Sequence, residues 1–342
     1  MNVINCCDLI EAQLNSIYQH ADEIIIIEGA YKKFSVNAPN ATSTDNTVSN
    51  ILQFPDPENK IKLFTNNAFF DDRAEMCSEI VRNATGDILF QVDVDEFYQD
   101  STHRFVRQAF EESQELDQMS FMFVDFFFRS DLHVAGTMEK GLNDVRRVFR
   151  LRGATHFLSQ RPPSLAVNGT ELQPRKYLKG EQLKVNGHLM LHATAVTMRQ
   201  ISEKYLYYNA MWGIDNNAQD NFSVRGIDLL NAHGIPRYLT PIDKININIP
   251  EAMQPVFSLV DKDLLDEVEL KVNDARFMFA KDLAISIIQI HRPNYLLSVP
   301  ANFAKLVRLP PTQSIQFLIV QIFCVLRLVK SKWYRFINTS AR

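Results

Sequence analysis

Residues 80–98 read IVRNATGDILFQVDVDEFY, and this stretch decides the expected fold. Residues 88–90 are a short apolar run, as in a strand that is buried on both faces of a mostly parallel sheet. Because side chains alternate along a strand, Asp93 and Asp95 just after it are expected to point to the same side. Ligands of open α/β sheets bind beyond the carboxyl ends of the strands, so both carboxylates are predicted to face a binding crevice.

Two neighbouring carboxylates at the end of a buried strand repel each other and lose hydration. A divalent cation is the simplest partner that makes such an arrangement favourable. The alternative is a plain turn followed by a helix cap, since Asp100 and Ser101 can cap the next apolar-periodic segment. The residues around the motif favour the cation.

Composition sets broad limits on the class of protein. The chain has 342 residues, 46% of them hydrophobic and 22% charged, which suggests one large domain with additions or two domains. A net charge of −4 gives no reason to expect nucleic acid as a partner. Four cysteines without CxxC spacing, and the lack of a signal peptide after Met1, predict a reduced, cytoplasmic setting.

The first third of the chain alternates between strand and helix patterns. Strands are predicted at residues 3–6, 24–27 and 60–64. Helices are predicted at residues 9–20, from after residue 47 through residue 51, and from residues 70–73 to about residue 83. The second strand ends in Glu28, so an acidic residue again follows a buried apolar run. This order predicts an α/β fold with a parallel sheet.

The middle of the chain carries further candidate site residues. The apolar run at residues 119–128 contains Asp125, a carboxylate that needs a partner or a function there. A basic strand is expected at residues 144–152, a loop at residues 156–163 and a helix at residues 197–212. His188 and His192 are spaced i, i+4, so they would share a face of a strand, and neutral imidazole binds several divalent metals.

Four motifs in order resemble the GT-A glycosyltransferases of the family-2-like group. They are IIIIEGA, STDNT, DDRAEMCSEIVRNATGD and VDVDEF, and the likeness covers residues 1–208. The later segments RRVFRL, HFLSQRPP and NGHLMLHA are similar to that group with less specificity. The chain departs from the pattern in having Glu28 where the family often has Asp, and in a long insertion before Ser43.

The resemblance implies a GT-A, Rossmann-like fold and a role for each matching residue. Glu28 and Asp45 would lie near the uracil and ribose of a nucleotide-sugar, and Arg73 near the donor. Asp93 would contact the ribose or the metal, and Asp95 would bind Mn²⁺ or Mg²⁺ directly. His192 or His188 would complete the metal shell, with His192 slightly favoured.

The implied activity is that of a hexosyltransferase-type enzyme. It would move a sugar from a nucleotide diphosphate, UDP in the family's usual form, to a hydroxyl of a glycan or lipid-linked acceptor in polysaccharide or glycolipid synthesis. An inverting enzyme also needs a carboxylate base on the opposite side of the sugar. The candidates are Asp125, Asp131, Asp144 and Glu171, and Asp144 is chosen because two arginines follow it.

Two other functions are considered. One is an enzyme that uses the same acidic pair, and the other is a scaffold that keeps only the fold. A nucleotidyltransferase or phosphohydrolase shares such a metal site, although a Gly-rich phosphate loop and a denser carboxylate cluster are both missing from the sequence. A non-catalytic scaffold would not need both Asp93 and Asp95. The glycosyltransferase therefore remains the leading hypothesis.

The last third is expected to extend the catalytic domain. Residues 1–222 are assigned to that domain, residues 223–311 to an acceptor-side helical region, and residues 312–342 to an amphipathic, basic C-terminal helix. The apolar run at residues 314–329 is shorter than the roughly 20 residues of a spanning helix. Followed by Trp333, Tyr334 and basic residues, it suits peripheral contact with the inner face of an anionic membrane, or packing against protein.

Liposome flotation tests the membrane hypothesis. The full chain is expected to float with anionic vesicles, and a chain that ends at Pro311 is expected to stay at the bottom of the gradient, because the apolar face and basic tail are removed together. Equal behaviour of the two chains would assign this segment to protein packing instead.

Overall fold

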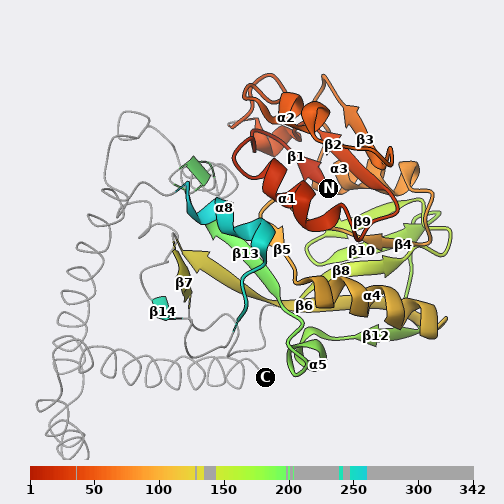
Figure 1. Ribbon diagram of the computed structural model, residues 1–342. Helices are drawn as coiled ribbons and strands as arrows, with labels where there is room; N and C mark the ends of the chain where they lie inside the picture. The colour runs from red at the N-terminus through yellow and green to blue at the C-terminus, as the bar shows by residue number, and fades with distance from the viewer. Residues whose placement is uncertain are drawn as a thin grey trace, which may run out of the picture. The chain divides into compact units, whose positions relative to one another are not determined.

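A three-stranded parallel sheet opens the fold, as the alternation of strands and helices predicted. Its strands follow the order β1 (Asn2–Val3), β2 (Ile24–Glu28) and β3 (Ile61–Thr65). Helices α1 (Ile10–Ile17) and α2 (Thr47–Gln53) make the two crossovers (Figure 1). Val3 lies opposite Glu28, and Glu28 opposite Thr65, so the three strands end together at one edge.

The computed structural model describes residues 1–35, 37–127, 129–134, 144–197, 199–200, 203, 239–241 and 247–259. The chain divides into two compact units, residues 1–265 and 266–342, and every described residue belongs to the first. The predicted domain boundaries at 222 and 311, and the C-terminal helix at 314–329, fall outside the described residues and stay predictions. Most of the helix expected at residues 197–212 falls outside them too.

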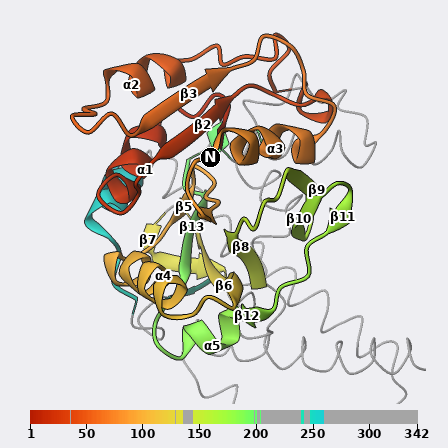
Figure 2. The same cartoon turned by 90° about the vertical axis from the view of Figure 1, so that its right-hand side faces the viewer.

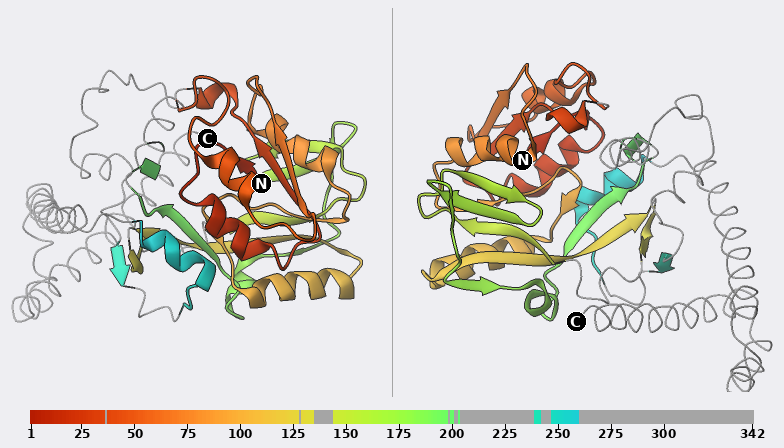
Figure 3. Two further views of the ribbon diagram at one scale, coloured as in Figure 1. Left: turned by 45° about the horizontal axis from the view of Figure 1, so that its top comes forward. Right: turned by 180° about the vertical axis from the view of Figure 1, so that it is seen from behind.

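A second, mixed sheet is built around the long strand β6 (Leu116–Phe127). Figure 3 shows β13 and β6 running side by side. Strands β12 (Lys176–Leu178) and β13 (Met190–Ala195) pair with β6 in parallel, whereas β7 (Arg129–Val134) and β8 (Asp144–Arg150) pair with it antiparallel. The outer strands are β4 (Ile88–Phe90) on β8, β5 (Glu96–Phe97) on β13 and β14 (Leu239–Pro241) on β7, all antiparallel.

The segment at residues 156–163 forms part of a hairpin, so the loop predicted there is wrong. Strands β9 (His156–Gln160), β10 (Pro163–Val167) and β11 (Thr170–Glu171) pair antiparallel. The two prolines that suggested a loop sit at the turn, where the Arg161–Pro162 peptide is cis. Phe157 and Leu165 are buried against α3 (Arg73–Asn83), and the N–H of Phe157 donates to Ser78 Oγ at 2.9 Å.

Helices pack against the sheets, and their buried side chains join those of the strands in the core. Figure 2 shows α3 beside the β9–β10 hairpin and α4 (Asp100–Glu112) beside β6. Asp72 caps α3 by accepting from the N–H of Glu75 at 2.9 Å. The shorter helices are η1 (Lys32–Phe34), α5 (Gly180–Lys184), η5 (Glu251–Met253) and α8 (Gln254–Phe257). Within the described residues, no helix has the length and apolar character to cross a membrane.

One carboxylate ties the two sheets together. Glu23, just before β2, accepts from Lys62 Nζ at 2.6 Å and from the N–H groups of Thr85 and Gly86 at 2.6 and 3.0 Å. Burial would raise the pKa of Glu23, but Lys62 and these N–H donors outweigh it and hold the pKa at about 2. The ionised form of Glu23 therefore stabilises the approach of β2, β3 and β4.

Replacing Glu23 by Gln is expected to destabilise the fold in a pH-dependent way. Since the folded-state pKa lies below the ordinary value of 4.5, the contribution is complete above that pH and is lost as the pH falls towards 2. Urea unfolding should show a loss on the order of 2 kcal/mol at pH 7 that shrinks by pH 3. Glu58→Gln, whose side chain is 61% exposed, is the control and should change little. A loss independent of pH would refute the ionic role of Glu23.

Candidate functional site

A cavity of about 540 Å³ opens at the carboxyl ends of the parallel strands β1 and β2. This volume falls in the usual range of ligand pockets. Residues beyond those two strands line one end of it, including Asn5, Cys6, Ala30 and Tyr31. Residues of β8 and β13 and the segment between β4 and β5 line the rest, among them Asp93, Asp95, Asp144, Arg147 and His192. The structure thus gathers the acidic pair, the later histidine and the basic strand around one cavity.

Strand register assembles the acidic corner of this cavity. Glu96 of β5 lies opposite His192 of β13, and His192 lies opposite Asp125 of β6. Asp95 immediately precedes β5, so its carboxylate also reaches the imidazole. Register therefore places Glu96, His192 and Asp125 in one row across three strands, and Asp95 contacts the imidazole from the residue before β5.

His192 is held between two carboxylates. Its Nδ1 lies 2.6 Å from Asp125 Oδ1 and its Nε2 lies 3.4 Å from Asp95 Oδ2. Burial would lower the pKa of His192, but Asp95 and Asp125 outweigh burial and raise the pKa to about 10. The imidazole is therefore protonated in the absence of a metal, and its positive charge balances the acidic corner.

Asp93 is paired with arginines, which differs from the expected role as a metal ligand. Arg73 Nη2 donates to Asp93 Oδ2 at 2.7 Å, and Arg147 Nη2 donates to the same oxygen at 3.3 Å. Burial would raise the pKa of Asp93, but the two guanidinium groups lower it to about 2. The two aspartates have different partners, because Asp93 faces the helix α3 side while Asp95 faces β13.

Arg147 forms the most buried ion pair of the site. Its side chain is 9% exposed, and it donates from Nε to Glu96 Oε2 at 2.7 Å and from Nη2 to Glu96 Oε1. Burial raises the pKa of Glu96, while the carboxylates of Glu96 and Asp93 raise the pKa of Arg147 further above its usual range. This bidentate geometry fixes the guanidinium plane at the cavity wall.

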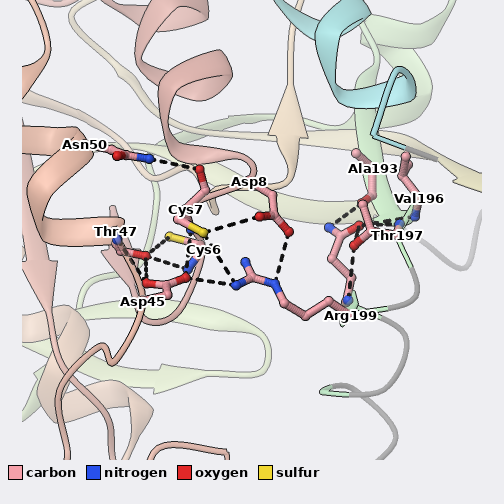
Figure 4. A network of polar contacts seen from close by, with 11 residues as sticks. Cys6, Cys7, Asp8, Asp45, Thr47, Asn50, Ala193, Val196, Thr197 and Arg199 are labelled. Carbon is pink, nitrogen blue, oxygen red and sulfur yellow. Dashed lines mark hydrogen bonds and ion pairs between the residues drawn. The ribbon is translucent and has the colours of Figure 1, made fainter. Parts of the chain in front are cut away.

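Glu28 and Asp45 lie behind the cavity wall and do not line it. Glu28, 1% exposed at the end of β2, accepts from the N–H of Ser43 at 2.5 Å. Asp45 accepts from the N–H groups of Thr47 and Cys7 at 2.9 and 3.1 Å (Figure 4). Both carboxylates thus shape the loop that precedes α2, which is the role expected of a local cap.

Arg199 is a cavity residue that the sequence did not reveal. Its Nη1 donates to Asp45 Oδ2 at 2.9 Å and its Nε lies 3.0 Å from Asp8 Oδ2 (Figure 4). Asp45 and Arg199 are 154 positions apart in the chain, and no motif surrounds the arginine. Only the return of the chain after β13 brings it beside the N-terminal loops.

Asp144, the candidate catalytic base, begins β8 and lines the cavity. Its Oδ1 accepts from the N–H of Gly180 at 3.0 Å and its Oδ2 accepts from the hydroxyl of Tyr177 at 3.2 Å. A β-carbon at Gly180 would come within 2.5 Å of Asp144 Oδ1 and of the backbone nitrogen of Met122. This close approach fixes the carboxylate while leaving it lone pairs for a further proton donor.

The remaining candidates are not brought to the acidic corner. His188 precedes β13, where its Nδ1 lies 3.1 Å from Thr102 Oγ1 and its ring stacks on Phe105. Because His188 lies outside the strand, it does not share a face with His192, contrary to the i, i+4 expectation. Glu171 is exposed on β11 away from this cavity, and the side chain of Asp131 is not among those described.

The residues of the acidic corner could supply part, but not all, of the ligands of a divalent metal. Among the described residues, no cluster of three or more His, Cys, Asp or Glu side chains is arranged to hold a metal unaided. Asp95 and His192 are two adjacent donors, and Asp125 on the far ring nitrogen would orient the imidazole as an outer partner. Mg²⁺ is usually held by one or two carboxylates together with substrate phosphates, so a two-residue site suits a phosphate-bearing ligand.

Removing the guanidinium of Arg147 is expected to leave Glu96 as an uncompensated buried charge. Arg147→Met should lower the free energy of unfolding by about 3–5 kcal/mol, and the double variant Glu96→Met/Arg147→Met should recover most of that loss. Urea denaturation of the single and double variants measures the coupling free energy between the two side chains. Arg146→Met is the matched control, because the contacts described for Arg146 are with the carbonyl of Pro163 at 3.4 Å and the ring of Tyr177, and neither partner is a buried carboxylate. Equal losses of unfolding free energy in Arg147→Met and Arg146→Met would contradict the role of Arg147 as the partner of Glu96.

Comparison with known proteins gives two structural likenesses. A mannosyltransferase from Pyrobaculum calidifontis, PcManGT, solved in complex with GDP-Man and Mn²⁺, has 14% identity and a TM-score of 0.40, over 97% of this chain and 85% of its own. TarS 1–349 of S. aureus has 13% identity and a TM-score of 0.32, over 69% of this chain and 80% of its own. No family model and no curated protein matches the sequence. Both TM-scores are below 0.5, so the function is argued from the site itself.

Proposed function

We propose that this protein is a metal-dependent glycosyltransferase of the GT-A type that uses a nucleotide-diphosphate sugar. The observation that carries the proposal is one cavity in which two metal-donor side chains, Asp95 and His192, stand beside two arginines, Arg73 and Arg147. Carboxylate and imidazole suit Mn²⁺ or Mg²⁺, and guanidinium groups suit phosphate oxygens. A diphosphate is the ligand that satisfies both sets at once.

The position of the cavity agrees with this ligand. Ligands of α/β sheets bind outside the carboxyl ends of parallel strands, and residues beyond β1 and β2 form one end of the cavity. That end is lined by apolar and aromatic side chains, including Leu9, Tyr31 and Phe34, which suit a nucleobase. The nucleotide would therefore lie along the N-terminal sheet, with its diphosphate at the acidic corner and its sugar towards β8.

Each residue has a distinct part in the reaction. Asp95 and His192 would hold the metal, which as a Lewis acid stabilises negative charge on the departing diphosphate. Asp93 would position Arg73 so that the guanidinium group faces the phosphates. Arg147, locked by Glu96, would add fixed positive charge in a site from which water is partly excluded. Asp125 keeps the His192 ring oriented.

Asp144 remains the candidate base for the acceptor hydroxyl. Its carboxylate lies on the wall of the same cavity and is fixed by two hydrogen bonds. A fixed carboxylate that keeps a free lone pair can accept the acceptor's proton as the new glycosidic bond forms. The expectations of a UDP donor and of a glycan or lipid-linked acceptor in polysaccharide or glycolipid synthesis rest on the sequence resemblance.

The products distinguish this proposal from the other enzymes that share such a site. Incubation with Mn²⁺ and a panel of nucleotide sugars should raise the melting temperature and release a nucleoside diphosphate, because a glycosyltransferase breaks the bond at the anomeric carbon. A phosphohydrolase would instead split the diphosphate with water into a nucleoside monophosphate and a sugar phosphate. A nucleotidyltransferase would release the sugar phosphate and pass the nucleotidyl group to an acceptor, which with added pyrophosphate gives a nucleoside triphosphate. No shift in melting temperature with any nucleotide sugar would refute the proposal.

Asp95→Asn is expected to lower Mn²⁺-dependent nucleoside diphosphate release at least about 100-fold, which is about 3 kcal/mol of lost transition-state stabilisation. The substitution keeps the size of the side chain and removes the charge that binds the metal. Asp100→Asn is the matched control, because Asp100 is 70% exposed and contacts only His20 among the partners described. Unchanged release by Asp95→Asn, with normal folding by circular dichroism, would remove Asp95 from the metal site.

A further inference from the structure

Arg199 is the cation that faces the nucleotide end of the cavity. It lines the cavity together with Asn5, Cys6 and Leu9 from the loop that follows β1. Its contacts with Asp8 and Cys7, the latter at 3.7 Å from Nη1 to Sγ, place it on the same side as those residues (Figure 4). The metal-donor pair of Asp95 and His192 belongs to strands of the other sheet. Arg199 therefore lies where the proposed function puts the nucleobase.

Two carboxylates hold the guanidinium group, and the hydrogen bonds of Gln200 hold the segment that carries Arg199. From the N-terminal sheet, Asp8 and Asp45 engage Nε and Nη1. In its own segment, the neighbouring Gln200 donates from Nε2 to the carbonyl of Ala193 at 2.9 Å and accepts at Oε1 from the N–H of Thr197 at 3.0 Å. Ala193 directly follows His192, and Thr197 lies four residues further along the same segment. The arginine is thus pre-organised before any ligand binds, which preserves binding energy and orientation.

The carboxylates expected to read the base are occupied. Asp45 already accepts from Cys7, Thr47 and Arg199, and Glu28 accepts from Ser43. Neither side chain lines the cavity. What the loop presents to a ligand is therefore the guanidinium that Asp45 holds, and an arginine has hydrogen-bond donors only.

We infer that Arg199 determines which nucleobase the donor carries, and that it selects a base with an oxo group, uracil or guanine, over the amino bases cytosine and adenine. This inference rests on the proposed function and adds a specificity residue to it. The edge of guanine offers O6 and N7 as acceptors, and a 4-oxo pyrimidine offers O4, whereas cytosine and adenine present an amino donor at the equivalent position. A donor-only group at the base edge leaves that amino group without an acceptor.

Binding of four nucleoside diphosphates to the full-length protein tests this assignment. Isothermal titration calorimetry with UDP, GDP, CDP and ADP in the presence of Mn²⁺ should show UDP or GDP binding about 10-fold or more tightly than both CDP and ADP. Arg199→Gln should bring that ratio close to one, because an amide can donate to an oxo group and accept from an amino group. Arg199→Lys should keep the affinity for the diphosphate part while reducing the ratio.

Arg161→Gln is the charge-matched control, because Arg161 lines the cavity at the β9–β10 turn and is no part of the Arg199 contacts. It should shift all four affinities by a common factor and keep the ratio. A wild-type protein that binds the four nucleotides equally overturns the Arg199 assignment without the need for a variant. An equal loss of affinity for all four nucleotides in Arg199→Gln also overturns the assignment, because it would make Arg199 a phosphate ligand. If none of the four binds with Mn²⁺, the proposed function itself fails.

Discussion

The buried contact between Arg147 and Glu96 constrains the rest of the site. A guanidinium group taken out of water is tolerated only when its hydrogen bonds are nearly all made, and here the carboxylates of Glu96 and Asp93 make them. Arg147 belongs to β8, and its two partners come from β5 and the turn before β5. Strand β4 lies beside them, since the N–H of Gln91 donates to the carbonyl of Arg147 at 2.8 Å. One side chain therefore fixes how three strands meet at the edge of the cavity.

The acidic residues of the motif DVDE are divided between two kinds of cation. Asp93 and Glu96 belong to arginines, and Asp95 belongs to His192. This division answers the electrostatic problem that the motif poses, since neighbouring carboxylates cannot all be buried with the same kind of compensation. It also gives the cavity two chemically different ways to bind the diphosphate that we propose as its ligand, through fixed guanidinium groups and through side chains that could bind a metal.

Local sequence patterns predicted the parts of this protein that depend on neighbouring residues. The strands β2, β3, β4 and β6 occur where apolar runs predicted strands, and the helices α1, α3 and α4 occur where apolar periodicity predicted helices, because both signals depend on neighbouring residues. The hairpin at β9–β10 was missed, because two prolines at a turn give the same signal as an irregular loop. Glu28 and Asp45 were placed on the right elements but were given ligand roles, since the sequence could not show that backbone N–H groups would occupy them.

The parts that depend on long-range register were beyond the sequence. Asp95, His192 and Asp125 meet because β5, β13 and β6 align at Glu96, His192 and Asp125, and neither spacing nor composition encodes that alignment. The pair of histidines was separated for the same reason, because β13 begins after His188. Arg199 reaches Asp45 across 154 positions, so no local pattern announces it.

The tight fit at Gly180 has a consequence for how this cavity can change. Any larger residue there would press on the backbone of β6 as well as on Asp144, and a backbone atom in a central strand cannot swing aside as a flexible side-chain tip does. The position of Gly180, behind Asp144, therefore tolerates no larger residue. Evolution or protein engineering that seeks to admit a bulkier ligand must change side chains inside the cavity, such as Val145 or Phe123, and must leave the glycine untouched.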